Sequence, residues 1–351
     1  MRNNPFITYI APIRNESLFI ERTIRSIINQ KNNNFDFEII IADGMSTDGT
    51  RNIIKRLMKT VNEIRLIDNP EKIVPTGFNR ALSISRGDYI IRIDGHAELA
   101  TDFLQNSLKE LKTTNADCVG GPIKNIATGM IGNTIAIAQQ SKFGVGGVAF
   151  RENISIGKYV DTLAFGTYRR QVFKQIGGYD IELVRNQDDE FNFRMVQQDL
   201  KIWLHPSIKS YYYPKSAINS LFKQYFQYGF FKIRVFQKRS GTASFRHIVP
   251  LIFIINLFYA IYSYLVTDFN IPILILGISY ISISIIFTIK ETLKNFNTGF
   301  SLIFLPIIFL TLHIAYGLGS FFGLFYFINK WNDKGLKDKY FNKEKFVNLN
   351  V

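Results

Sequence analysis

Three long apolar runs near the end of the chain constrain its fold more than any other feature. They cover residues 249–266, 271–289 and 301–328, and none contains a Lys, Arg, Asp or Glu. A helix of about 20 apolar residues crosses the roughly 30 Å hydrocarbon core of a bilayer. Three such helices in a soluble protein would need a core larger than 351 residues supply. The sequence therefore predicts a transmembrane region over 248–329, followed by a Lys-rich tail at 330–351.

Residues 1–215 show a different pattern, in which short apolar runs alternate with segments of helical spacing. The expected strands are 6–12, 38–43, 63–67, 88–94 and 117–121, and the expected helices are 18–29, 52–61, 77–85 and 102–113. This alternation predicts an α/β domain with a doubly wound, mostly parallel sheet. Ligands of such sheets bind beyond the carboxyl ends of the strands. The Gly-rich stretch 122–160 is expected to form loops near that site.

Charge and cysteine content exclude several classes of protein. The net charge is +14, but the sequence contains no nucleic-acid-binding motif. We therefore expect attraction to an anionic membrane surface and to phosphate-bearing substrates. The single cysteine, Cys118, allows neither an internal disulfide nor a cysteine metal cage. The first apolar stretch, Phe6 to Ile13, is too short for a signal peptide, so we expect a buried strand and a cytosolic N-terminal domain.

Polar residues follow two of the expected strands. Asp43 ends the second strand, where a carboxylate can accept a hydrogen bond from a nucleobase. Asp94 and His96 end the fourth strand, and an extended backbone would point both side chains the same way. Both residue types can ligate a divalent cation that bridges a diphosphate. An isolated D-x-H pattern, however, is more often a turn with a surface histidine.

A run of three acidic residues, Asp188, Asp189 and Glu190, opens an amphipathic segment. Acidic side chains are favoured at helix N-termini by the helix dipole, and that explains one or two of them. A carboxylate at such a position can also serve as a general base.

Taken together, these blocks resemble the family 2 glycosyltransferases, which are inverting enzymes with the GT-A fold. The motifs that carry the resemblance are APIRNE (11–16), IIADGMSTDGT (40–50), GFNRALSISRGDYIIRIDGHAEL (77–99), FGTYRRQVFKQIGGYD (165–180) and RNQDDEFNFR (185–194). The resemblance covers about residues 5–210. The apolar C-terminal part is similar to the subgroup that builds bacterial exopolysaccharide repeat units, of the succinoglycan glucosyltransferase type.

The resemblance implies a role for each matching residue on the donor side. Pro12, Asn15, Glu16 and Asp43 would line the nucleoside pocket. Asn79 would lie near the donor diphosphate, and Asp94 with His96 would match the family's D-x-D and hold Mn²⁺ or Mg²⁺. The expected donor is a nucleotide sugar, most simply a UDP-sugar.

On the acceptor side, the resemblance makes Asp188 the catalytic base, with Asp189 and Glu190 beside the substrate. The expected acceptor is a lipid-linked oligosaccharide or glycan. Two positions depart from the family pattern: His96 replaces an aspartate and Gln187 replaces a glutamate. The Q-x-x-R-W motif of processive synthases is absent from the sequence, which favours the addition of one sugar per acceptor.

The segment 216–247 is basic and aromatic, which is typical of helices in the membrane interface. We expect Lys232 and Arg234 there to guide the acceptor towards the site. A plain helix packed on the catalytic domain is the alternative.

Two rules conflict on the topology. A single span over 301–328 would place the tail outside, whereas the tail's lysines favour the cytosol. We expect a broken or re-entrant element, interrupted near His313, Gly317, Gly319 and Gly323, to return the tail to the cytosol.

Two other functions remain open at this point. A polyprenyl-phosphate sugar transferase would use the same fold and similar motifs. A membrane scaffold with a degenerate transferase domain would explain the departures at His96 and Gln187.

Overall fold

The computed structural model describes residues 4–30, 35–152, 154–214, 216–242, 244–295 and 303–336. Contacts divide these residues into two units. The first comprises residues 4–124 and 154–213, and the second comprises 125–152 and 214–335. Residues 125–152 therefore do not pack as loops of the first unit, as the sequence suggested, because they form apolar helices of the second.

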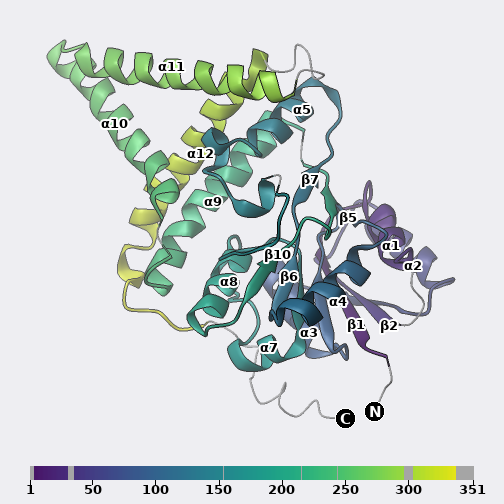
Figure 1. Ribbon diagram of the computed structural model, residues 1–351. Helices are drawn as coiled ribbons and strands as arrows, with labels where there is room; N and C mark the ends of the chain where they lie inside the picture. Colours follow the sequence, from purple (N-terminus) through teal and green to yellow (C-terminus); the bar gives the residue numbers. More distant parts are fainter. Residues whose placement is uncertain are drawn as a thin grey trace. The chain divides into compact units, whose positions relative to one another are not determined.

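An eight-stranded sheet forms the centre of the first unit (Figure 1). Its strands, in spatial order, are β3 (Ile64–Asp68), β2 (Asp36–Asp43), β1 (Phe6–Ile13), β4 (Tyr89–Arg92), β9 (Gly166–Arg169), β6 (Cys118–Gly120), β10 (Ile202–Leu204) and β8 (Lys158–Tyr159). The first four strands are mutually parallel, as expected. Strand β9, however, runs antiparallel to both β4 and β6, so the sheet is mixed.

Near-continuous apolar runs explain why the central strands are buried on both faces. Ile7, Tyr9, Ile39, Ile41 and Ile91 belong to one core cluster and are almost completely enclosed. The helices of this unit are α1 (Ile20–Ile28), α2 (Thr50–Met58), α3 (Val74–Ser83), α4 (Phe103–Thr114), α7 (Arg170–Ile176) and α8 (Gln187–Gln197). A second sheet has the order β5 (Ala97–Leu99), β11 (Ser210–Tyr212), β7 (Ile123–Asn125).

The parallel strands bring their carboxyl ends to one edge. In the register of the sheet, Ile13 of β1 lies beside Asp43 of β2, which lies beside Asp68 of β3. Strand β4 ends at Arg92, two residues earlier than expected. Asp94 lies in a turn, which the Ala97 amide closes by donating to the Asp94 carbonyl at 3.2 Å.

The second unit is helical within the described residues, apart from the end of β7. It contains α5 (Gly129–Ala138), α6 (Lys142–Val145), η1 (Ala149–Arg151), α9 (Ile218–Lys238), α10 (Phe245–Thr267), α11 (Ile271–Lys294), α12 (Leu305–Tyr326) and η3 (Ile328–Lys330). Of these, α10, α11 and α12 are long and apolar enough to cross a membrane. The start of the expected 301–328 run and the tail from Lys337 onwards lie outside the described residues.

The expected break in the third apolar run is wrong, because α12 is one continuous helix of 22 residues. Its glycines serve close packing instead. A β-carbon on Gly319 would come within 2.0 Å of the Phe226 carbonyl oxygen of α9, and one on Gly317 within 2.3 Å of the Pro250 carbonyl oxygen of α10. Figure 1 shows α9 running beside α12. These glycines let backbones approach where any side chain would collide.

Candidate active site

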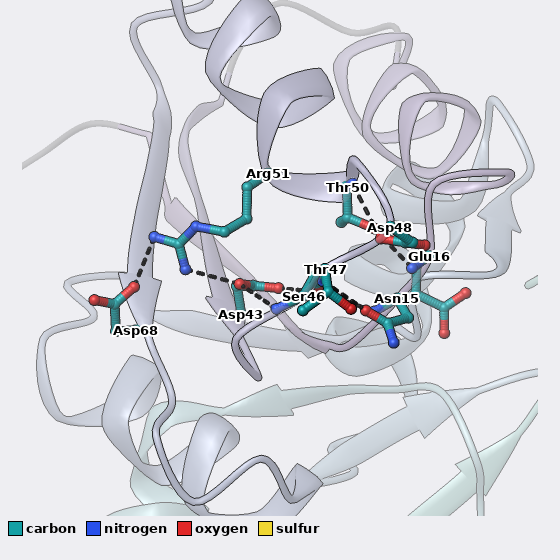
Figure 2. Close-up of polar contacts among 9 residues, drawn as sticks. All are labelled: Asn15, Glu16, Asp43, Ser46, Thr47, Asp48, Thr50, Arg51 and Asp68. Atoms are coloured by element: carbon teal, nitrogen blue, oxygen red, sulfur yellow. Dashed lines mark hydrogen bonds and ion pairs between the residues drawn. The ribbon is translucent and has the colours of Figure 1, made fainter.

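Two loops at the carboxyl edge of the sheet are joined by hydrogen bonds (Figure 2). The backbone N–H of Asn15 donates to Ser46 Oγ at 2.8 Å, and the side-chain oxygen Oδ1 of Asn15 accepts from the backbone N–H of Thr47 at 2.9 Å. The Glu16 amide donates to Thr50 Oγ1 at 2.8 Å. Asn15 has a φ of 56°, in the left-handed region that asparagine tolerates better than most residues. The structure thus brings the predicted residues Asn15, Glu16 and Asp43 to one edge, and Pro12 is buried at the end of β1 beside them.

Asp48 stabilises the same junction. Its carboxylate accepts hydrogen bonds from the Ser17 amide at 3.0 Å and from the Thr50 amide at 3.1 Å. Burial acts to raise the pKa of Asp48, but the hydrogen bonds from Thr50 and Ser17 outweigh it and hold the pKa at about 2. These hydrogen bonds therefore favour the ionised form of Asp48 in the junction.

The Asp43 carboxylate is fully buried and already has several donors. Its Oδ2 accepts from the Ser46 amide at 3.0 Å and from Arg51 Nη1 at 2.8 Å, and its Oδ1 accepts from Ser46 Oγ. The other terminal nitrogen of Arg51 donates to Asp68 Oδ1 at 2.8 Å. Asp43 therefore holds the Arg51 guanidinium and the Ser46 loop in place at the edge where the nucleoside was expected.

His96 lies in the turn that follows β4, and not on the extended backbone we expected. Its Nδ1 lies 2.8 Å from Glu16 Oε1, and its Nε2 lies 3.0 Å from the Tyr212 hydroxyl oxygen. Both ring nitrogens are therefore engaged with protein groups. The predicted metal-ligand role of His96 does not fit this arrangement, in which His96 connects the Glu16 loop to β11.

A buried arginine links the other two candidate carboxylates. Arg92 Nη2 donates to Asp94 Oδ1 at 2.7 Å, and Nη1 lies 3.6 Å from Asp188 Oδ2. Nη1 also donates to the Ala164 carbonyl at 3.0 Å. The Arg92 side chain is 5% exposed, whereas those of Asp94 and Asp188 are 23% and 31% exposed. The cation thus lies beneath two carboxylates that remain accessible to a ligand.

Asp188 lies in the first turn of α8, where its Oδ1 accepts a hydrogen bond from the Asp189 amide at 3.0 Å. Burial raises the pKa of the Asp188 carboxyl above its ordinary value, and the positive charge of Arg92 acts in the opposite direction. The negative charges of Asp189 and Asp94 raise it further. A carboxylate with a raised pKa is a better proton acceptor, which suits a general base.

Two other predicted substrate-binding residues are engaged within the protein. Glu190 is fully buried and forms an ion pair with Arg194 Nε at 2.8 Å, one helical turn away. Asn79 is also fully buried, and its side-chain amide exchanges two hydrogen bonds of 2.8 Å with the backbone of Tyr179. The expected substrate contact of Glu190 is therefore corrected: its side chain has a structural role in α8. Asn79 positions the loop that leads towards α8.

The two basic residues expected to guide the acceptor lie in the second unit and are buried. Arg234 is fully enclosed, and its guanidinium donates to the carbonyls of Lys330 and Asp333 at 2.9 and 2.8 Å. Lys232 is 4% exposed, with its ammonium 5.8 Å from the centre of the Phe236 ring. Helix α9 packs on α12, and this burial argues against the acceptor role for both side chains.

Sequence reasoning missed Arg92 and Arg51. Arg92 could have been found, because it is a charged residue inside an otherwise apolar strand, YIIRID. A buried charge is costly unless it is paired, so its presence there points to carboxylate partners nearby. Arg51 carried no such signal, because an arginine in the first turn of an amphipathic helix is ordinary.

The residues of this edge fit a divalent cation only in part. Within the described ranges, no group of three or more His, Cys, Asp and Glu side chains is arranged to hold a metal ion. Asp94 is partly exposed and can supply one carboxylate ligand, with the remaining ligands to come from a bound diphosphate.

The chain is similar to several known glycosyltransferases. The family model "Glycosyl transferase family 2" matches residues 8–177. The succinoglycan biosynthesis protein ExoA of Rhizobium meliloti is 32% identical over 244 residues, which is 69% of this chain and 73% of ExoA. A Methanococcus voltae enzyme named dolichyl N-acetyl-alpha-D-glucosaminyl phosphate 3-beta-D-2,3-diacetamido-2,3-dideoxy-beta-D-glucuronosyltransferase is 28% identical over 91% of this chain and 97% of its own length.

A solved structure shares the fold. The mannosyltransferase PcManGT from Pyrobaculum calidifontis, in complex with GDP-Man and Mn²⁺, superposes with a TM-score of 0.55. It is 17% identical, and the match covers 91% of this chain and 87% of that one. The expected GT-A-like α/β fold with apolar C-terminal helices is thereby confirmed. The chain belongs to glycosyltransferase family 2 and is a glycosyltransferase.

Proposed function

We propose that the protein transfers a hexose from a UDP-sugar, with inversion, to a lipid-linked oligosaccharide or glycan in bacterial surface or exopolysaccharide synthesis. The observation that carries the proposal is the pair of accessible carboxylates, Asp94 and Asp188, which come from different elements and share one buried guanidinium. The names of the relatives support the acceptor class, since one concerns succinoglycan and the other a dolichyl-linked sugar.

The proposed chemistry is a single displacement. Asp188 Oδ2 takes the proton of the acceptor hydroxyl, and the hydroxyl oxygen attacks the anomeric carbon of the donor sugar. The bond to the nucleotide diphosphate breaks, and the diphosphate leaves with the electron pair. Asp188 suits this step because Arg92 approaches its Oδ2 only to 3.6 Å, which leaves that oxygen able to accept a proton.

Asp94 is the residue we propose to hold a divalent cation, Mn²⁺ or Mg²⁺, together with the donor diphosphate. A bound cation supplies positive charge for the leaving diphosphate. The Mn²⁺ in the complex of PcManGT supports this proposal. Arg92 keeps the Asp94 carboxylate oriented through the bond of 2.7 Å.

We place the nucleoside at the ends of β1, β2 and β3, beside Pro12, Asn15 and Glu16. The hydrogen-bonded junction of the two loops forms the wall of this region, and Asp43 fixes it from below through Ser46 and Arg51. We also propose that this domain lies in the cytosol, because nucleotide-sugar donors are made there.

The test is a screen of the purified full-length protein against a panel of nucleotide sugars, with release of the nucleoside diphosphate as the readout. Each donor is offered with a polyprenyl-diphosphate oligosaccharide and, separately, with bare polyprenyl phosphate. We expect turnover with a UDP-sugar and the oligosaccharide, and transfer to bare polyprenyl phosphate would favour the alternative enzyme class.

The matched variant is Asp188→Asn, which keeps the shape of the side chain and removes the base. We expect a loss of transfer of about 10² to 10⁴-fold, which is the usual contribution of a general base. Donor affinity, measured by calorimetry, should stay within a few-fold. Normal turnover in this variant would refute the role of Asp188.

A further inference from the structure

The segments on either side of the three apolar helices are bonded to each other. Before α10, at the end of α9, Arg234 donates to the carbonyls of Lys330 and Asp333, which follow α12. Gln237 Nε2 donates to the Phe327 carbonyl at 2.8 Å, and Lys238 Nζ donates to the Gly335 carbonyl at 2.8 Å.

Bonds of this length cannot connect groups on opposite sides of a bilayer, whose hydrocarbon core is about 30 Å thick. The end of α9 and the segment after α12 therefore lie on the same side. Helix α9 does not cross, because it carries Lys223, Lys232, Arg234 and Lys238 within 21 residues. Between these two segments the chain must make an even number of crossings, although it has three helices of sufficient length.

The packing of α12 distinguishes it from the other two helices. Leu305, Phe309, Leu312 and Ala315 are buried in a cluster with residues of α5 and α9. In the most apolar 18-residue stretch of α12, 44% of the residues are buried within the protein. The corresponding shares are only 17% in α10 and 6% in α11. Lipid-facing helices leave their apolar side chains uncovered by protein, as α10 and α11 do.

Contacts with α9 extend along the second half of α12. A β-carbon on Gly229 would come within 2.0 Å of the Tyr316 carbonyl oxygen, and one on Gly323 within 2.7 Å of the Phe230 carbonyl oxygen. Because α9 is too polar for the hydrocarbon core, the part of α12 that is fastened to it must lie outside the core as well.

We propose that α10 and α11 form the membrane anchor as a helical hairpin, and that α12 does not cross but packs with α9 on the side where the chain enters. The hairpin turns at Asp268–Asn270, where the two helices meet (Figure 1). This arrangement keeps Lys330 and Lys334 on the entry side, in agreement with the preference of lysine-rich segments for the cytosol. With two crossings instead of three, the lysine-rich segment after α12 lies on the side that its charge favours.

The test is labelling of single introduced cysteines with a membrane-impermeant maleimide in intact cells and after lysis. The native Cys118 is fully buried and provides a quiet background. The four variants are Ser240→Cys before α10, Phe269→Cys at the hairpin turn, Lys294→Cys at the end of α11, and Lys334→Cys after α12. All four side chains are exposed.

We expect Phe269→Cys to be labelled in intact cells, and the other three only after lysis. Opposite labelling of Ser240→Cys and Lys334→Cys would refute the even number of crossings. Labelling of Lys294→Cys on the far side would refute the hairpin, because one of its helices would then lie along the membrane.

If one cysteine variant is not expressed, a second measurement tests the same position. A short epitope tag inserted at each position is read by antibody before and after permeabilisation, with the same expected pattern. Because the labelling does not depend on sugar transfer, its outcome is independent of the proposed activity.

Discussion

At the scale of single residues, we expect the acid limb of the pH–rate profile to report on Asp188, the proposed base. The base must be ionised, so transfer is lost as the pH falls through its pKa. Burial raises that pKa, so we expect the acid limb to lie above the ordinary aspartate value of about 3.9. Thermal unfolding over the same pH range serves as the control, since the fold should persist where the rate falls. An acid limb at or below the ordinary value would contradict this assignment.

Arg92 gives a second prediction at this scale. Arg92→Lys keeps the positive charge but loses the planar fork that reaches two carboxylates and a carbonyl at once. We expect turnover to fall about 100-fold, the typical cost of misplacing reacting groups by about 1 Å. The KM for the donor should change much less.

Arg169→Lys is the matched control for Arg92→Lys. Arg169 is also held by backbone carbonyls, those of Ala116 and Leu111, but has neither Asp94 nor Asp188 as a partner. We expect it to cost stability while leaving the turnover of folded molecules unchanged. If the two variants behaved alike, Arg92 would have a structural role only.

The sequence could predict which residue types lie at the site, but not their partners. The motifs placed Asp43 correctly at a strand end and Asp188 at a helix start, whereas Asp94 lies two residues beyond the end of β4. They could not show that a turn after Arg92 directs His96 towards Glu16 and Tyr212, because the end of a strand depends on its neighbours in the sheet. Likewise, the burial of Glu190 against Arg194 follows from the orientation of α8.

At the scale of elements, the contact between α9 and α12 depends on glycine. Gly319→Ala would place a methyl group in collision with the Phe226 carbonyl oxygen, so the helices must separate. We expect a destabilisation of about 1–3 kcal/mol, as for other overpacked sites. The measurement is thermal unfolding of the purified protein in detergent.

Gly277→Ala is the control, because nothing lies within 4 Å of the added carbon in α11. That variant should be neutral or slightly stabilising, since alanine favours helix over glycine by roughly 0.5–1 kcal/mol. Equal effects of the two substitutions would show that helix propensity, and not the contact with α9, determines the result.

Most elements were predictable because their apolar periodicity is strong. The four parallel strands and the flanking helices appear within a few residues of their expected positions. Helix α5 was missed because two of its ten residues are glycine, which is typical of loops. The continuity of α12 was missed for the same reason, since glycine permits a break and close packing equally well.

At the scale of the whole molecule, the change of composition after residue 215 correctly indicated two parts of different character. It could not show that residues 125–152 belong to the second part, because their place in that part depends on long-range packing against α12. The net charge of +14 agrees with a membrane-associated protein. Arg92 and Arg234, however, are buried and do not add to the positive charge of the molecular surface.

The stereochemistry of one transfer tests the central claim most directly. A single displacement in which Asp188 acts as the base, with no covalent intermediate, inverts the anomeric carbon. The measurement is the proton NMR spectrum of the product formed from an α-linked UDP-sugar by the purified protein, with Asp188→Asn as the blank. We predict a β-linked product that is absent from the Asp188→Asn reaction. An α-linked product would contradict it, because a single displacement at the anomeric carbon cannot retain the configuration.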